Sequence, residues 1–501
     1  MSGPIPAPGR RGRGLERDLA SLVGPRAVSI EPADLWAASR DTWVKTILRT
    51  RARLSAQAPD AVVWPADAAQ VAAILRFAGP RQIPVVPFGS GSGGGGGALP
   101  VQGGIVLDLK RLATPPAIDL PARTVEASAG TLGRVLAARL AEEGAALGHE
   151  TATGTVGGWL ATRSAGRGST RYGKIEDIVL SLEAVDGTGE LLRTLDVPSA
   201  GPDLTQLLVG SEGTLAVFTS AKLRIWPRPR ARWTRGVRFP SLRAGIAAAR
   251  AVLRAGFRPA QLRLRDPLDA LLESTGPVRL PRPLRWLADG AQKETLKLAL
   301  RAPALLNRLA DAFPGGTLLA LGFDGGSEED VADEGEAALA LCQGERGEDL
   351  GPVPAERGGR ERTVARLLAA GAFVDTLDVA TTWDRLSQLH ESVRQAAASH
   401  ALVFAELSHA ALEGCAIEFT FSGLAGDGSD PEEEEARYDA CWTAALSAAA
   451  DAGATLSHHR GVGLSRQAFL AREHGDGMRQ LRALKKAFDP HGVLNPGKLL
   501  L

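Results

Sequence analysis

A run of glycine and serine residues after an apolar segment has a spacing that could support chemistry. Gly89, Gly91 and Gly94 satisfy the pattern G-x-G-x-x-G, and Asp108 lies 19 residues beyond Gly89. In a nicotinamide-binding fold, such glycines bring backbone N–H groups close to a pyrophosphate, and an acidic residue at a similar distance binds the ribose. The first interpretation is therefore a dinucleotide site.

Two other interpretations compete with the nicotinamide site. A nicotinamide loop must open a helix, but GGGALPVQGG follows here, and an interior glycine costs a helix about 0.8–1.0 kcal/mol and a proline about 3 kcal/mol. A flexible Gly/Ser linker predicts a change of domain across the run. Strand patterns on both sides instead favour a loop whose N–H groups form a nest for an anion such as a pyrophosphate, with Ser90 and Ser92 as further donors.

The elements that must position this loop have α/β texture. Apolar runs predict short strands, and apolar residues at helical spacing predict the helices between them. Strands are expected at 62–65, 83–88, 104–109, 124–130, 178–187, 189–194 and 216–227, and helices at 67–79 and 131–144. The basic segment 228–232 is a predicted hinge, and we expect a domain boundary there.

Two regions flank this predicted domain. Residues 1–14, rich in Pro, Gly and Arg, are expected to be a disordered tail, and residues 15–57 a helical arm. Beyond the hinge, alternating strands and helices predict an α+β domain over 229–455, in which the charged stretch 345–362 is expected to be a mobile loop. Residues 456–501 contain a His pair and a predicted helix.

The composition disfavours several classes of protein. The chain has 501 residues, with 58 basic against 57 acidic side chains, so nucleic acid is not expected as a partner. No apolar run reaches the roughly 18–20 residues of a transmembrane helix, and the N-terminus has no apolar core of a secretory signal. The spacing of Cys342, Cys415 and Cys441 fits neither a zinc site nor a disulfide framework, so we expect a cytoplasmic protein.

Several segments resemble a known family. Residues 62–93, 155–190 and 207–225 resemble the FAD-binding domain of the vanillyl-alcohol oxidase/p-cresol methylhydroxylase flavoproteins, and the nearest branch is alkyldihydroxyacetonephosphate synthase. The similarity continues through 456–463 and the closing stretch 489–500. The family is therefore expected to account for nearly the whole chain.

The resemblance implies an α+β fold of three parts. Residues 58–228 would form a two-subdomain FAD-binding domain of the p-cresol methylhydroxylase (PCMH) type, and 229–455 a cap domain that binds the substrate. The segment 456–501 would pack on the FAD domain and contribute to the active site.

The resemblance also implies FAD as the cofactor. The loop 87–93 would hold its pyrophosphate, the residues after Thr155 would run beside the flavin, and 211–215 would cover the adenosine. No histidine follows the glycine loop, so FAD is expected to be held noncovalently. The expected FAD-binding residues are Pro87, Gly89, Ser90, Gly91, Ser92, Gly93, Thr155, Gly157, Gly158, Thr162, Ile175, Ser211, Glu212, Gly213 and Thr214.

The resemblance assigns the substrate site to few residues. Arg263 would hold a phosphate or carboxylate, for which a bidentate guanidinium is suited. His458 and His459 fall on the histidine cluster of the synthase, and a neutral imidazole is a suitable general base. Adjacent side chains on a strand point in opposite directions, so one of the two is expected to face the flavin. No metal site is expected, because the upstream HxH or HGDGNxH pattern is absent.

The chain also departs from the synthase pattern. Arg460 stands at the third histidine of the cluster, and Glu418 at the catalytic tyrosine. The segment before Thr155 is shorter, and Val197 lies near the place of an expected arginine. Glu418 is expected to act as a base, or to form a purely structural ion pair with Arg460; the sequence leaves both open.

Three functions remain open at this stage. The first is an FAD-dependent oxidoreductase acting at flavin N5 on a small anionic hydroxy or carbonyl substrate, with His459 or Glu418 as base. The second is an alkylglycerone-phosphate synthase of ether-lipid metabolism, which exchanges acyl for alkyl without net redox change and would need peripheral membrane contact. The third is a flavin-binding scaffold without turnover. A homodimer is also expected.

Overall fold

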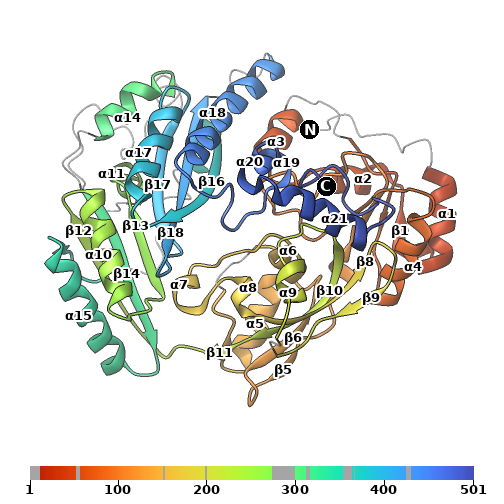
Figure 1. Cartoon of the computed structure of the whole chain (residues 1–501), viewed down its shortest axis with the longest axis horizontal. Helices are drawn as coiled ribbons and strands as arrows, with labels where there is room; N and C mark the ends of the chain where they lie inside the picture. The colour runs from red at the N-terminus through yellow and green to blue at the C-terminus, as the bar shows by residue number, and fades with distance from the viewer. Residues whose placement is uncertain are drawn as a thin grey trace. The chain divides into compact units, whose positions relative to one another are not determined.

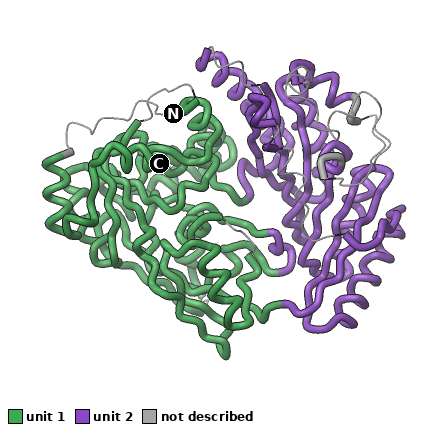
Figure 2. The backbone as a smooth tube through the Cα atoms, turned by 180° about the vertical axis from the view of Figure 1, so that it is seen from behind, with its two compact units in different colours: residues 1–166, 172–228, 459–501 green, residues 167–171, 229–458 purple. Residues whose placement is uncertain are grey.

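The computed structural model divides the chain into two compact units, coloured separately in Figure 2. Unit 1 comprises residues 1–166, 172–228 and 459–501, and unit 2 comprises residues 167–171 and 229–458. The division after Arg228 falls within the predicted hinge. The structure describes residues 12–51, 57–149, 153–197, 200–273, 300–311, 316–353, 364–365, 367–424 and 430–501.

The first sheet of unit 1 is small and mostly parallel. Its strand order is β1 (Val28–Ser29), β2 (Ala61–Val63), β4 (Ile105–Asp108) and β3 (Val85–Phe88), labelled in part in Figure 1. The pairs β2–β4 and β4–β3 are parallel, and β1 runs antiparallel to β2. The strands are continuous apolar runs because both faces are covered, as is usual for parallel strands. Helix α4 (Ala68–Ala78) begins at Asp67, whose side chain accepts the N–H of Gln70 at 2.8 Å.

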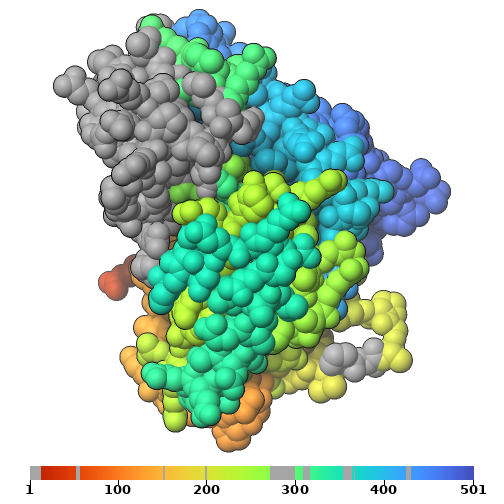
Figure 3. Space-filling view, turned by 90° about the vertical axis from the view of Figure 1, so that its left-hand side faces the viewer, coloured from red at the N-terminus to blue at the C-terminus, as the bar shows by residue number. Residues whose placement is uncertain are grey.

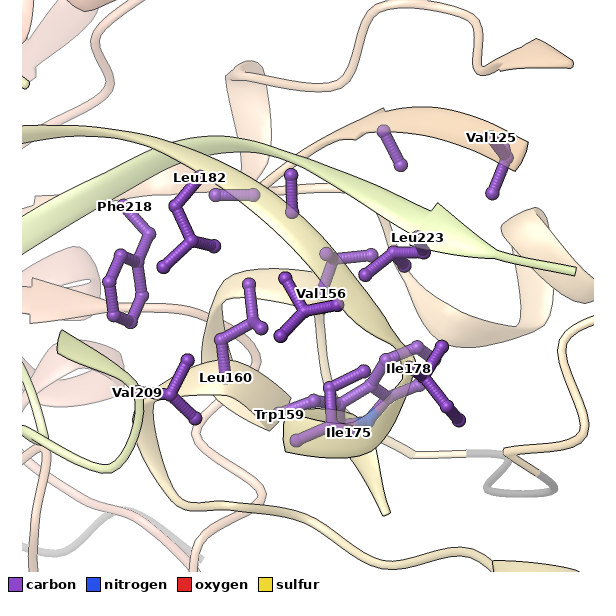
Figure 4. Close-up of a cluster of buried hydrophobic side chains, with 14 of the residues drawn as sticks. Val125, Val156, Trp159, Leu160, Ile175, Ile178, Leu182, Val209, Phe218 and Leu223 are labelled. Atoms are coloured by element: carbon purple, nitrogen blue, oxygen red, sulfur yellow. The ribbon is translucent and has the colours of Figure 1, made fainter. Parts of the chain in front are cut away.

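The second sheet of unit 1 is antiparallel. Its order is β5 (Ala117–Asp119), β6 (Thr124–Ser128), β10 (Ala216–Arg224), β8 (Val179–Asp186) and β9 (Leu191–Arg193). Figure 4 shows its core, where Leu182 and Phe218 from the strands meet Val156 and Leu160 of α6 (Val156–Ala161) and Ile178 of α8 (Ile175–Ile178). Helix α5 (Gly133–Glu142) adds Leu136 and Leu140 to this core.

Unit 2 contains a seven-stranded sheet in which every neighbouring pair is antiparallel. Its order is β15 (Glu348–Asp349), β12 (Ala231–Phe239), β14 (Thr317–Gly325), β13 (Gln261–Arg265), β17 (Leu402–Ser408), β18 (Gly414–Leu424) and β16 (Ala372–Thr382). Helices α10 (Leu242–Arg254) and α15 (Glu328–Gly344) pack on β12 and β14 and form part of the surface seen in Figure 3. Helix α17 (Leu386–Ala397) packs on β17 and β18, and α18 (Pro431–Asp451) packs on α17. The α+β class is therefore confirmed.

Three expectations need correction. The stretch 345–362 is not entirely a loop, because β15 pairs with β12 at the sheet edge through Glu348 and Arg238; residues 354–363 lie outside the described residues. The predicted tail ends earlier than expected, since α1 (Gly12–Val23) begins at Gly12, and residues 1–11 are outside the described residues. The predicted helical arm also contains the strand β1. A strand of two residues is too short to show the alternating pattern by which a strand is recognised in a sequence.

The C-terminal segment belongs to unit 1 from His459 onward, three residues later than expected. It contains α19 (Gly463–Arg466), α20 (Leu470–His474) and α21 (Gly477–Phe488). In α21, the buried Lys485 ammonium donates to the Asp489 carboxylate at 2.6 Å and to the carbonyls of Thr214 and Leu494 at 2.8 and 2.7 Å. One lysine thus joins the C-terminal segment to the turn before β10.

Among the described residues, no helix combines the length and the apolar character needed to cross a membrane.

Replacing Lys485 with methionine should destabilise unit 1 by roughly 3–5 kcal/mol, because it leaves the Asp489 carboxylate, 2% exposed, without its cation. Urea unfolding measures the change. The exposed neighbour Lys486 provides the control, and Lys486→Met should stay within about 0.5 kcal/mol of wild type. Equal effects of the two variants would contradict the assigned role of Lys485.

Candidate functional site

The glycine run is an ordered loop between two strands of one sheet. The Thr42 hydroxyl donates to the carbonyls of Ser92 and Gly93, both at 3.0 Å, and the Asp41 carboxylate accepts the N–H of Gly96 at 2.9 Å. The backbone of Gly96 has φ of +77°, a left-handed conformation that glycine adopts without strain. The N-terminal arm therefore fixes the shape of this loop.

The C-terminal segment holds the same loop at its far end. The N–H groups of Leu464 and Ser465 donate to the Gly95 carbonyl at 2.7 and 3.1 Å. The Asn495 side-chain amide donates to the Gly97 carbonyl at 2.9 Å. Parts of the chain nearly 400 residues away thus bind the run, which excludes a flexible linker.

The nicotinamide interpretation is also excluded. No helix follows the glycines before β4. The Asp108 carboxylate is 7% exposed and accepts the Trp64 indole N–H at 3.0 Å and the Lys110 ammonium at 2.7 Å. The acid that matched a ribose-binding position therefore has a structural role at the end of β4.

A cavity of about 340 Å³ adjoins the glycine run within unit 1. Its walls come from 87–98, 153–165 and 212–218, with Leu109, His459, Arg460 and Gly463. The predicted residues that line it are Pro87, Gly89, Ser90, Gly91, Ser92, Gly93, Thr155, Gly157, Gly158, Thr162, Glu212 and Gly213. The structure therefore brings together three stretches that are distant in the sequence.

The three remaining predicted residues lie outside the cavity lining. Ile175 is fully buried in the core of the second sheet. Thr214 is also buried, and its hydroxyl donates to the Ser211 carbonyl at 2.7 Å. The buried Ser211 hydroxyl has no hydrogen-bond partner among the described residues. Ser211 and Thr214 therefore flank two residues of the cavity lining, Glu212 and Gly213, whereas Ile175 is part of the hydrophobic core.

Two glycines of the site are required by close packing. A Cβ on Gly89 would lie 2.5 Å from the Thr155 hydroxyl oxygen, and a Cβ on Gly157 would lie 2.9 Å from the Ala129 Cβ. Thr155 also caps α6 by accepting the N–H of Gly158 at 3.2 Å. The backbone of Gly89 therefore packs directly on the Thr155 side chain at the start of α6, and the backbone of Gly157 packs on Ala129.

Glu212 anchors the segment that carries His459 and Arg460. Its carboxylate, 8% exposed, accepts the N–H groups of Val462 and Gly463 at 2.5 and 2.9 Å. Burial raises the pKa of Glu212, and these two donors act in the opposite direction. Although Glu212 lines the cavity, its carboxylate serves the loop of unit 1 that follows Arg460.

The predicted anion holder lies in unit 2. On β13, the Arg263 guanidinium donates to the Glu406 carboxylate of β17, with Nε and Nη2 at 2.7 and 2.6 Å from Oε1. The Arg263 side chain is 22% exposed, and Glu406 is buried. Arg263 is thus held in a defined orientation by an acidic partner that the sequence did not reveal.

His458 also lies in unit 2, whereas His459 lines the cavity of unit 1. The backbone N–H of His458 donates to the Asp378 carboxylate at 2.9 Å. Its ring stacks on the ring of His409, with centroids 5.8 Å apart. In the sheet, Glu418 on β18 is directly opposite Asp378 on β16.

Two histidines escaped the sequence analysis. His409 follows β17 with φ of +53°, and its Nδ1 lies 2.5 Å from the Ser169 hydroxyl. Such a conformation in a residue other than glycine often marks a functional site. His149 is 4% exposed, neither of its ring nitrogens has a hydrogen-bond partner among the residues that the structure describes, and its ring meets Trp159 edge-on. Neither lies in a spaced motif, so no sequence signal distinguished them.

Burial strongly affects the protonation of His149. Burial, followed by the charge of His459, lowers the pKa of His149 to about 3. His149 is therefore neutral at physiological pH. Its ring contacts Trp159, which lines the cavity.

Among the described residues, no group of three or more His, Cys, Asp or Glu side chains is arranged to hold a metal ion.

The variant Gly96→Ala should destabilise the protein by about 2–3 kcal/mol. The alanine must adopt a left-handed backbone conformation, and its Cβ would lie 2.8 Å from the Trp43 ring. Gly93→Ala is the matched control, since its Cβ has no heavy atom within 4 Å. Thermal unfolding compares the two. A Gly93 variant as unstable as the Gly96 variant would show that the run is sensitive for another reason.

Acid should destabilise wild type more than the variant His149→Gln. A lowered folded-state pKa means that the unfolded chain takes up the proton first, so stability is present above pH 6.5 and lost as the pH falls toward 3. Between pH 7.5 and 5, wild type should lose roughly 2 kcal/mol more than the variant in urea unfolding. Parallel losses would show that His149 does not titrate in this way.

Comparison with known proteins finds two family models that together match most of the chain. A family model described as "FAD binding domain" matches residues 59–195, and one described as "FAD linked oxidases, C-terminal domain" matches residues 228–499. FAD is therefore the cofactor, and the glycines and the serines at 90 and 92 that line the cavity are suited to its phosphate groups.

Individual relatives agree with these matches. Alkyldihydroxyacetonephosphate synthase of Dictyostelium discoideum is 26% identical over 91% of this chain and 76% of its own length. D-lactate dehydrogenase of Archaeoglobus fulgidus is 28% identical over 88% of this chain and 91% of its own length. The structure of p-cresol methylhydroxylase with substrate bound is 18% identical, has a TM-score of 0.74, and matches 98% of each chain. The chain belongs to the FAD-linked oxidases.

Proposed function

We propose that this protein is an FAD-dependent oxidoreductase that oxidises a small anionic hydroxy substrate. The observation that carries the proposal is that His459 and Arg460 line the same cavity as the glycine loop. A possible base and a permanent cation thus stand beside the cofactor site. The similarity to D-lactate dehydrogenase supports hydroxy-acid oxidation as the type of reaction.

The chain would hold FAD through its own backbone and hydroxyl groups. The loop 89–93 would present N–H groups and the hydroxyls of Ser90 and Ser92 to the pyrophosphate, since all five residues line the cavity. The lining contains no Cys or Tyr among the described residues, and His459 is its one histidine. Noncovalent attachment is therefore proposed, with His459 reserved for proton transfer.

Oxidation of an alcohol to a carbonyl breaks its O–H and C–H bonds: the O–H hydrogen leaves as a proton, and the C–H hydrogen leaves with two electrons as a hydride. FAD supplies the acceptor for the two electrons. His459 takes the hydroxyl proton at a ring nitrogen, and Glu418 is the alternative base. Arg263 is the proposed holder of the substrate anion, and an anion held by a guanidinium has a defined orientation. Arg460 supplies a cation beside the cavity of unit 1.

The second candidate is an alkylglycerone-phosphate synthase of ether-lipid metabolism. The 26% identity to the Dictyostelium synthase over most of both chains favours it. Glu418 and Arg460 weigh against it, since they stand where the resemblance expects a tyrosine and a histidine. A scaffold without turnover is less favoured, because a cavity lined with His459 and Arg460 suits catalysis.

The two reactions differ in whether the flavin is reduced. The FAD-loaded protein, incubated without oxygen, should lose its yellow colour with a 2-hydroxy acid and should release no fatty acid from palmitoyl-dihydroxyacetone phosphate. Fatty-acid release with incorporation of a fatty alcohol, and no bleaching, would instead establish the synthase. Absence of both reactions would leave the scaffold, and a protein that takes up no FAD would refute all three.

Arg263→Ala should raise the KM for that hydroxy acid at least tenfold while FAD stays bound, because the guanidinium is proposed to bind the substrate anion. Arg254 on the exposed end of α10 provides the control variant, Arg254→Ala, with unchanged kinetics expected. Loss of FAD with unchanged KM would contradict the role of Arg263.

A homodimer, a cytoplasmic location and peripheral membrane contact remain predictions.

A further inference from the structure

A second cavity of unit 1, of about 680 Å³, adjoins the glycine loop. Its walls come from α2 (Pro32–Ala38), α3 (Val44–Arg51), the segment between these helices, and the carboxyl ends of β2, β3 and β4. Ser90 and Gly91 line both this cavity and the cofactor cavity. The second cavity is named the arm cavity below, because the N-terminal arm forms much of its wall.

Arg40 lies in the wall of the arm cavity without a counter-ion. Its guanidinium carbon is 3.3 Å from the centroid of the Trp36 ring, so the planar group stacks on the indole. None of the described residues accepts a hydrogen bond from this guanidinium or forms an ion pair with it. The side chain is partly buried, and burial lowers the pKa of Arg40. A partly buried charge of this kind is costly, and a bound anion would offset that cost.

The carboxylates in the described walls of the arm cavity already have other donors. Asp108 is paired with Lys110 at 2.7 Å, Asp41 accepts two backbone N–H groups, and Asp34 accepts a serine hydroxyl at 2.6 Å. Arg51, at the end of α3, is a second lining guanidinium without an ion pair among the described residues. The walls therefore contain two cations that no described carboxylate contacts.

Apolar side chains form another part of the wall. Val62 and Phe88 are 2% and 7% exposed and belong to the buried cluster that joins α2 to the parallel sheet. Trp64 also lines the cavity, and Ile47 of α3 is 38% exposed there. A ligand with both an oxyanion and an apolar group would therefore find matching chemistry in the same cavity.

We propose that the arm cavity is a second ligand site, which takes a phosphate ester with an apolar group and binds its phosphate through Arg40. A guanidinium binds two phosphate oxygens at once, and stacking on Trp36 leaves the N–H donors of Arg40 free to do so in the plane of the group. A phosphate monoester carries nearly two negative charges at pH 8, which the two lining guanidinium groups can offset. The inference involves neither Arg263 nor His459, so it does not rest on the proposed oxidation.

Calorimetry with phenyl phosphate on the FAD-loaded full chain tests the inference, because FAD then fills the cofactor cavity. Phenyl phosphate should bind without release of FAD, and at least about fivefold more tightly than inorganic phosphate, because its ring covers apolar wall. Benzyl alcohol, which has the ring without the charge, should bind at least about tenfold more weakly than phenyl phosphate. Absence of binding, binding that releases FAD, or equal affinity for any two of the three probes would overturn the proposal, and no variant is needed.

The variant Arg40→Gln should weaken the binding of phenyl phosphate at least about tenfold, because it removes the charge and the bidentate donors. Arg26→Gln is the matched control, since Arg26 is an exposed arginine of the same arm, and it should keep the wild-type affinity. Flavin absorption and thermal unfolding show whether each variant is folded. A folded Arg40→Gln protein with wild-type affinity would refute the role of Arg40.

Arg40→Lys provides a second variant that keeps the charge and loses the planar fork. It should bind phenyl phosphate at least about threefold more weakly than wild type, and an unchanged affinity would refute bidentate binding.

Arg263→Ala separates the arm cavity from the substrate site of the proposed function. This variant should bind phenyl phosphate as wild type does. If Arg263→Ala removes the binding and Arg40→Gln leaves it intact, the anion occupies unit 2, and the second site is refuted. Because the KM for the hydroxy acid tests Arg263 by itself, the two proposals can fail independently.

Discussion

The cofactor cavity depends on how the glycine loop is held from both ends of the chain. The loop has too many glycines to define its own shape, since each adds backbone freedom that folding must remove. Asp41 and Thr42 from the N-terminal arm and Leu464 and Asn495 from the C-terminal segment supply that order by hydrogen bonds to its backbone. A nest of N–H groups can then face the cofactor without a helix behind it.

This arrangement places charges in the interior of unit 1. Burial raises the pKa of Asp41 to about 6 and lowers the pKa of Lys498 to about 8, and the fully buried Lys498 ammonium donates to the Leu99 carbonyl at 2.7 Å. Glu212 is stabilised by backbone N–H groups on the loop that follows Arg460. The same groups that close the cofactor loop therefore help to place His459 and Arg460 in the cavity.

Much of the site could be predicted because most of its residues lie in short segments of recognisable sequence. The loop from Gly89 to Gly93, the cap at Thr155 and the turn at Glu212 are short segments whose residues match motifs of the FAD-binding family, although distant contacts hold them in place. Glu406 and His409 could not be predicted in the same way. Their importance comes from cross-strand register and from a left-handed backbone, which place Glu406 against Arg263 and His409 against His458.

The sequence by itself determined the α+β class, because local periodicity and helix cost reveal strands and helices. It determined the identity of the cofactor only through the resemblance of its motifs to those of FAD-binding proteins. Only the tertiary structure decided that Asp108 is structural, that Glu345 to Arg362 contains an edge strand, and that His458 and His459 belong to different units. It also decided that Arg263 is ion-paired. The physical reason is that such pairs join residues far apart in the sequence, which only folding brings within hydrogen-bond distance: 143 positions separate Arg263 from Glu406, and 110 separate Arg238 from Glu348.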